Sequence, residues 1–90
     1  MERTVTVVPE DGLHARPAAK FVEAANEFDA DVQIAPADGE LVDAASMLAV
    51  TSLGVASGDD VRLVAEGDEA EPALDELESV LSTPETDTAT

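Results

Sequence analysis

The sequence predicts an α+β domain, an open-faced two-layer β-sandwich whose elements follow the order β-α-β-β-α-β-α. Apolar and polar residues alternate in short segments, which is typical of strands with one face in water. Apolar residues recur at spacings of three and four in two longer segments, as on one face of an amphipathic helix. Turn residues separate the segments closely, and short connections favour a four-stranded antiparallel sheet with three helices on one face.

The first strand and the first helix are expected over residues 4–8 and 15–28. Threonine alternates with valine in the strand, and the cluster Pro-Glu-Asp-Gly that follows it predicts a turn. Pro17 stands in the first turn of the helix, where its missing N–H is harmless. The apolar positions of the helix form one stripe, which consists of Ala18, Phe21, Val22, Ala25 and Phe28.

A hairpin and a short helix are expected next. Residues 31–35 and 40–43 are predicted strands, and a turn that contains proline and glycine separates them. Ser46 is expected to cap the N-terminus of a helix over residues 47–53, and Gly54 is expected to close it.

The last strand and the last helix are expected over residues 61–66 and 68–81. A turn at 57–60 precedes the strand, and Gly67 ends it. The buried face of the helix is predicted to consist of Ala73, Leu74, Leu77, Val80 and Leu81. The open face of the sheet is predicted to carry Thr4, Thr6, Asp31 and Gln33. One domain is therefore expected over residues 1–81, followed by a flexible polar tail at 82–90.

Acidic residues dominate the composition, with 21 Asp and Glu against four Lys and Arg and a net charge of −17. Nucleic acid is therefore not an expected partner, because binding it needs a basic patch, and an anionic membrane would repel the chain. No apolar run could span a membrane and the polar start is no signal peptide, so we expect a cytoplasmic location. With no cysteine and one histidine, we expect neither thiolate chemistry nor a zinc site. We also expect a monomer without a cofactor.

The only histidine lies in the stretch Gly12 to Ala19, GLHARPAA, at the start of the first predicted helix. The first N–H groups of a helix have no partners within it, and the helix dipole makes that end partly positive. This field favours the neutral imidazole of His14 and also favours an anion beside it. Arg16 adds a guanidinium group that can bind two phosphate oxygens. The arrangement indicates a histidine that accepts a phosphoryl group and passes it on.

The spacing alone leaves a simpler interpretation open. In it, His14 is an ordinary solvated side chain, and Arg16 is one of the few cations that relieve the repulsion among the carboxylates.

Residues 12–18, Gly-Leu-His-Ala-Arg-Pro-Ala, resemble the active-site signature of the HPr family, the histidine-containing phosphocarriers of the phosphoenolpyruvate:sugar phosphotransferase system. Residues 28–32, 46–54 and 67–77 resemble further segments of that family in the same order. The resemblance covers residues 3–81 without obvious gaps.

The resemblance implies that phospho-enzyme I phosphorylates His14 at Nδ1 and that His14 passes the group to a sugar-specific enzyme IIA. It implies that Arg16 neutralises the phosphoryl group. It implies that Gly12 and Pro17 shape the turn and the first helical turn, and that Leu13 packs the loop down or joins the partner contact. The residues we expect in the phosphate cradle and in partner docking are Gly12, Leu13, Ala15, Pro17, Ala18, Met47, Leu48 and Val50. The chain would then be a phosphocarrier rather than an enzyme, with no metal of its own.

Two features depart from the family. Ser46 matches a serine that a kinase phosphorylates in some bacterial members, but Ala45 stands where those members have lysine, and we favour the capping role. Members of the family also surround the site with lysines, whereas the first helix here carries Glu23 and Glu27. Docking is therefore expected to depend on apolar contacts. These contacts are expected around Leu13, Ala18, Met47, Leu48 and Val50.

Three other functions are open at this point. The chain could serve in a nitrogen-regulatory or dihydroxyacetone-kinase phosphorelay, because the motif is shared. A non-catalytic regulatory module of the same fold is a second alternative, against which the presence of His14 argues. An acidic mimic of nucleic acid is the third, and it leaves the histidine motif unexplained.

The excess of carboxylates predicts that added salt stabilises the folded chain, because screening weakens their mutual repulsion. A host with a salt-rich cytoplasm is expected for the same reason. The thermal unfolding midpoint, followed by circular dichroism at pH 7, should rise as KCl is increased from millimolar to molar concentrations. A midpoint that stayed constant or fell over this range would contradict the expectation.

Overall fold

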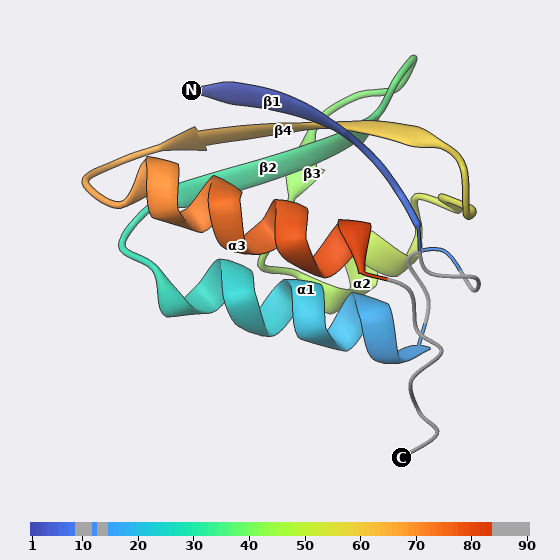
Figure 1. Ribbon diagram of the computed structural model, residues 1–90, viewed down its shortest axis with the longest axis horizontal. Coiled ribbons are helices and arrows are strands. Elements are labelled where there is room, and N and C mark those ends of the chain that lie inside the picture. The colour runs from blue at the N-terminus through green and yellow to red at the C-terminus, as the bar shows by residue number, and fades with distance from the viewer. Residues whose placement is uncertain (9–11, 13–14, 84–90) are drawn as a thin grey trace.

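Four strands and three helices follow one another in the predicted order in the computed structural model, which describes residues 1–8, 12 and 15–83 (Figure 1). The strands are β1 Glu2–Thr6, β2 Asp31–Pro36, β3 Val42–Asp43 and β4 Asp60–Glu66. The helices are α1 Ala15–Glu27, α2 Met47–Thr51 and α3 Ala70–Ser82. The remainder of the tail expected at 82–90, beyond Thr83, lies outside the described residues.

The strands form one antiparallel sheet in the order β1-β4-β2-β3, with β4 and β2 in the centre. The register places Val5 opposite Val61 and Ile34 opposite Leu63, and all four of these side chains are buried. Their neighbours along the strands point the other way because side chains alternate between the two faces. Thr4, Thr6, Asp31 and Gln33 are exposed on the open face. The predicted four-stranded open-faced sandwich is confirmed.

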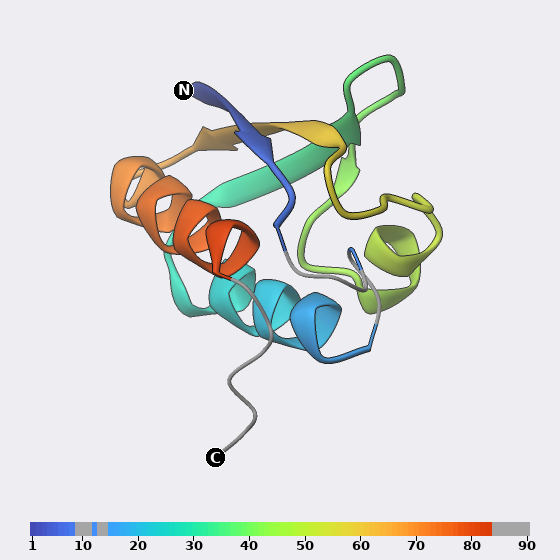
Figure 2. The same ribbon diagram turned by 45° about the vertical axis from the view of Figure 1, so that its right-hand side comes forward.

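Helices α1 and α3 lie side by side under one face of the sheet, and α2 packs against α1 near the N-terminal end of α1 (Figures 1 and 2). The largest fully buried side chains between sheet and helices include Phe21, Leu63 and Leu77. Among the described residues, no polar or charged side chain is buried. Burial of apolar surface therefore holds the two layers together.

The first strand has the predicted five residues but lies two positions earlier, at Glu2–Thr6 rather than at residues 4–8. The N–H of Val7 donates to the carbonyl of Asp59 at 2.9 Å, and that of Val8 donates to the carbonyl of Leu81 at 2.8 Å. The bond of Val7 still follows β4, since Thr6 pairs with Asp60, and the bond of Val8 leads the chain to the end of α3. The expectation of a strand over residues 4–8 was wrong for this reason.

The short helix also ends early, at Thr51 instead of residue 53. Ser52 is its C-cap, and the N–H of Leu53 donates to Val50, three residues back, so the last turn tightens. Gly54 is therefore not the cap as predicted, although its φ of 68° turns the chain beyond the helix.

Smaller shifts affect the other boundaries. Strand β3 has two residues instead of four, α1 ends one residue early, and β2 and β4 each gain one residue. Helix α3 starts at Ala70 rather than at residue 68 because Glu69 first donates its N–H to the carbonyl of Asp29 at 3.2 Å. Ser82, which was assigned to the tail, is the last residue of α3.

Arg3 connects the edge strand β1 to α3. Its Nη1 atom lies 2.8 Å from Asp75 Oδ1 and 2.9 Å from Glu78 Oε1. The hydrogen bond to Asp75 is the main reason why the pKa of Arg3 rises above its ordinary value. One of the four basic side chains is thus used to attach the sheet edge to a helix.

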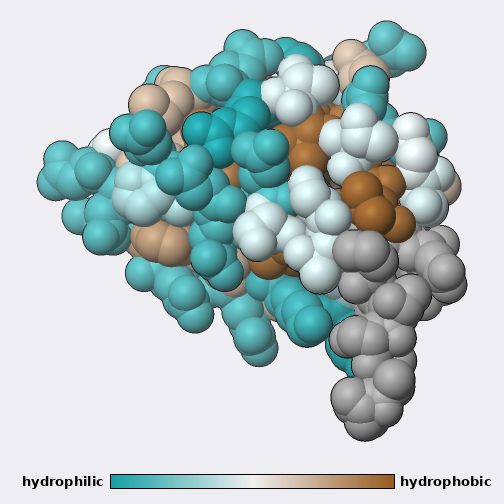
Figure 3. All heavy atoms as spheres, in the orientation of Figure 1, coloured by the Kyte–Doolittle hydropathy of each residue, from teal (hydrophilic) through white to brown (hydrophobic). Residues whose placement is uncertain are grey.

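Hydrophilic side chains cover most of the surface seen in Figure 3. No helix in the described part of the chain combines the length and the apolar character that crossing a membrane requires.

Candidate functional site

The predicted phosphoryl-carrying motif, residues 12–18, includes the start of α1. This helix begins at Ala15, the residue that follows His14 in the sequence. Leu13 and His14 themselves lie outside the described residues, so their roles stay predictions. Gly12 and the helix from Ala15 onward define the two sides of the motif.

Gly12 is buried and has a φ of 66°, a left-handed conformation that residues with a side chain rarely adopt. A Cβ atom at this position would overlap the carbonyl oxygen of Val55 and lie 2.8 Å from the Cα atom of Ala56. Both contacts are with backbone, which cannot rotate away. Glycine is therefore required here, and it fastens the chain two residues before His14 against the segment that follows α2.

Arg16 and Pro17 take the positions in the first turn of α1 that the sequence predicts. Arg16 is exposed, and Pro17 is buried where no helical N–H is needed. Lys20 is exposed one turn further on. A guanidinium and an ammonium group thus stand on the helix that begins immediately after His14.

The other two basic side chains lie on the sheet and contact carboxylates. Arg3 is held by Asp75 and Glu78, and Arg62 Nη1 lies 3.6 Å from Glu2 Oε2. Arg62 also donates to the carbonyl of Gly39 at 3.5 Å. Arg3 and Arg62 on the sheet therefore have their positive charge partly neutralised by carboxylates.

Helix α2 presents apolar side chains to water beside α1. Leu48 is 77% exposed and Met47 is 40% exposed, as expected of docking residues. The prediction that Ala18 and Val50 belong to the docking surface was wrong, since both are 0% exposed and form part of the core. The 3.6-residue period of each helix turns these two side chains toward the sheet.

The neighbourhood of α2 carries no charge in the sequence. No Asp, Glu, Lys or Arg occurs between Asp43 and Asp59, although the chain as a whole is 28% charged. This uncharged segment includes Val55 and Ala56, the residues that contact Gly12. Sequence reasoning did not identify these two residues, because nothing local indicates a contact so far along the chain.

Ser46 caps α2, as predicted. Its Oγ accepts a hydrogen bond from the N–H of Ala49 at 3.2 Å, and its backbone is extended, with φ −106° and ψ 115°. The side chain is half-buried. One N–H that the helix leaves without a partner is thereby satisfied.

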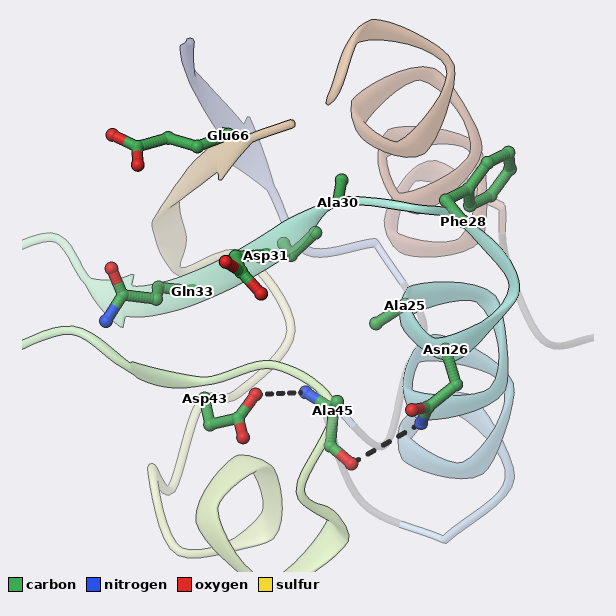
Figure 4. Close-up of a pocket in the computed structure, with 10 residues that line it drawn as sticks. Ala25, Asn26, Phe28, Ala30, Asp31, Gln33, Asp43, Ala45 and Glu66 are labelled. Atoms are coloured by element: carbon green, nitrogen blue, oxygen red, sulfur yellow. Dashed lines mark hydrogen bonds between the residues drawn. The ribbon is translucent and has the colours of Figure 1, made fainter. Parts of the chain in front are cut away.

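A hollow of about 620 Å³ lies at the opposite end of α1, between that helix and strands β2 and β3 (Figure 4). Carboxylates of Asp31, Asp43 and Glu66 line it, and Asp43 Oδ1 accepts the N–H of Ala45 at 2.9 Å. Three carboxylates repel a phosphoryl group, so this hollow is not a phosphate site. Within the described part of the chain, no group of three His, Cys, Asp or Glu side chains is arranged to hold a metal ion.

Comparisons with known proteins agree on one family. Residues 1–83 match the family model described as the PTS HPr component phosphorylation site. Phosphocarrier protein HPr of Haloferax volcanii is 76% identical over 86 residues, which cover 94% of this chain and 97% of that protein. Phosphocarrier protein HPr of Streptomyces coelicolor is 47% identical over 81 residues, which cover 90% and 87%. The crystal structure of a phosphocarrier protein HPr from Bacillus anthracis superposes with a TM-score of 0.86 at 40% identity, covering 90% of this chain and 95% of that one.

Removing the cap in the variant Ser46→Ala should lower the free energy of unfolding by about 1 kcal/mol, because the Ala49 N–H loses its partner. Urea unfolding at constant salt concentration measures the change. The matched variant Ser52→Ala, at the other end of α2, should change stability by less than about 0.5 kcal/mol. Equal losses in the two variants would contradict a specific capping role.

Proposed function

Since the chain belongs to the HPr family of phosphocarrier proteins of the phosphotransferase system, we propose that His14 is the residue that carries the phosphoryl group. The observation that carries the proposal is the motif GLHARPA, whose histidine directly precedes the first residue of α1. No other imidazole is present in the chain.

The proposed reaction is a direct transfer between histidine and partner. The neutral imidazole attacks phosphorus through Nδ1, a phosphorus–nitrogen bond forms, and the bond between phosphorus and the donor breaks. The donor is phospho-enzyme I, which obtains the group from phosphoenolpyruvate. An enzyme IIA then attacks the same phosphorus, and His14 is released unchanged.

The helix that follows His14 supports the proposed cycle. The unpaired N–H groups and the dipole at the N-terminus of α1 favour the negative charge of a bound phosphoryl group. The guanidinium of Arg16 is proposed to bind the phosphoryl oxygens. Gly12, Leu13, Ala15 and Pro17 would shape the cradle.

We propose that the chain acts as a carrier and not as an enzyme, since it takes up and releases one group and transforms no substrate of its own. Its proposed partners are enzyme I and a sugar-specific enzyme IIA, and it is proposed to need no metal or cofactor. It is proposed to work as a monomer in the cytoplasm. The similarity to the protein of Haloferax volcanii supports the salt-rich host expected from the net charge of −17.

Docking is proposed to rest on the apolar surface of α2. Met47 and Leu48 are exposed there, and the uncharged segment between Asp43 and Asp59 surrounds them. Electrostatic steering reaches only about 3 Å at molar salt, so charges on α1 such as Glu23 have little effect on encounter. Apolar contact is not screened by salt, which suits a partner in the same cytoplasm.

For Ser46 we propose the capping role rather than regulation by phosphorylation. Its hydroxyl oxygen is engaged with the Ala49 N–H, and Ala45 replaces the lysine that precedes this serine in kinase-regulated members of the family.

The variant His14→Ala should lose all phosphorylation, because no other imidazole is available. The natural chain is incubated with phosphoenolpyruvate and its own enzyme I in concentrated KCl, and acid-labile, alkali-stable phosphate is measured. The variant Glu76→Ala, at an exposed position of α3, keeps the histidine and serves as control. Labelling that survives in His14→Ala would overturn the proposal.

The variant Leu48→Ala should raise the KM for phosphorylation by enzyme I about tenfold and leave kcat unchanged, because it removes an exposed apolar anchor. Steady-state kinetics at molar KCl measure both constants. Leu41→Ala, in the loop before β3, is the matched control and should have little effect. A KM that rises steeply with KCl in the natural chain would contradict apolar docking and indicate charge pairing instead.

A further inference from the structure

Two described parts of the chain before His14 rest on one turn, formed by residues 55–59. The N–H of Val7 donates to the carbonyl of Asp59 at 2.9 Å, and the N–H of Gly58 donates back to the carbonyl of Val7 at 2.7 Å. Gly12, two residues before His14, lies against the backbone of Val55 and Ala56. The position of this turn therefore influences the path of the chain on the N-terminal side of His14.

The side chain of Asp59 closes the turn. Its Oδ2 atom accepts the N–H of Ala56 at 3.0 Å, and its own N–H donates to the carbonyl of Ala56 at 3.0 Å. Aspartate commonly fixes a turn through such a local bond from side chain to backbone. Gly58, with a φ of 92°, allows the tight reversal between the two residues. Asp59 thus fixes Ala56, whose Cα atom packs against Gly12.

Only one side chain of the turn is anchored in the core. Val55 is 2% exposed, whereas Ala56 to Asp59 are all exposed. An exposed local hydrogen bond contributes little to global stability. Its loss would therefore release the turn without unfolding the sheet and helices.

We propose that Asp59 is a positioning residue for phosphoryl transfer. By holding Ala56 it keeps Gly12 in its left-handed conformation against Val55, so that the chain is fixed two residues before His14. The carboxylate acts through the backbone and does not contact the phosphoryl group. The inference rests on the proposed function of His14.

The variant Asp59→Ala should lower the limiting rate of phosphoryl transfer from phospho-enzyme I about tenfold, with KM unchanged, since misplacement of a reacting group slows the chemical step. Asp59→Asn keeps an acceptor oxygen and should restore the rate to within about twofold. Asp60→Ala is the matched control, because this exposed neighbour has the same charge but accepts from Thr6 Oγ1, at 2.6 Å. It should behave as the natural chain does.

A second measurement needs no enzyme I. In amide NMR spectra of the full chain, the resonance of Gly12 should shift in Asp59→Ala and stay in place in Asp60→Ala. An unchanged limiting rate in Asp59→Ala, or an equal loss in Asp60→Ala, would overturn the positioning role while leaving the carrier function intact. A natural chain that is not phosphorylated on His14 would instead overturn the proposed function.

Discussion

The apolar contact between one face of the sheet and helices α1 and α3 is the interaction on which the rest of the molecule depends. Phe21, Leu63 and Leu77 are fully buried in it, and the described residues bury no polar side chain that could compete. Because the second face of the sheet stays in water, all three helices must share one side. Helix α2 then packs against α1 near its N-terminal end (Figure 2). The position of the proposed site is thus a consequence of one-sided packing.

The distribution of charge divides the surface into parts with different tasks. The chain has 21 acidic side chains against four basic ones, and two of the four, Arg3 and Arg62, lie in ion pairs on the sheet. Arg16 and Lys20 stand on the helix that starts after His14, and α2 next to it carries no charge. A strongly acidic protein can in this way keep a region that accepts a phosphoryl group and a partner. The carboxylates would serve stability and solubility in salt. Arg16, Lys20 and the uncharged α2 would serve phosphoryl transfer.

The periodicity of the sequence was sufficient for the element order, the sheet class and most of the core, since Phe21 and Leu77 could be assigned from helical spacing alone. It failed where a distant partner decides the outcome. The N–H of Val8 bonds to Leu81 at the end of α3 instead of continuing the first strand. Val50, assigned to docking, is a core residue, and so is Ala18, which periodicity had placed on the apolar stripe of its helix. The contact of Gly12 with Val55 joins segments far apart in the chain, and no local pattern encodes it. Motif and fold class were therefore predictable, but the support of the motif was not.

Nitrogen-15 NMR of the full chain labelled only at histidine shows whether the single imidazole carries the phosphoryl group. The spectrum is recorded before and after reaction with phosphoenolpyruvate and the chain's own enzyme I in concentrated KCl. One ring nitrogen, Nδ1 of His14, is expected to shift and to show coupling to phosphorus. A chain that gains phosphate while both imidazole nitrogen resonances stay unchanged would rule out His14 as the carrier.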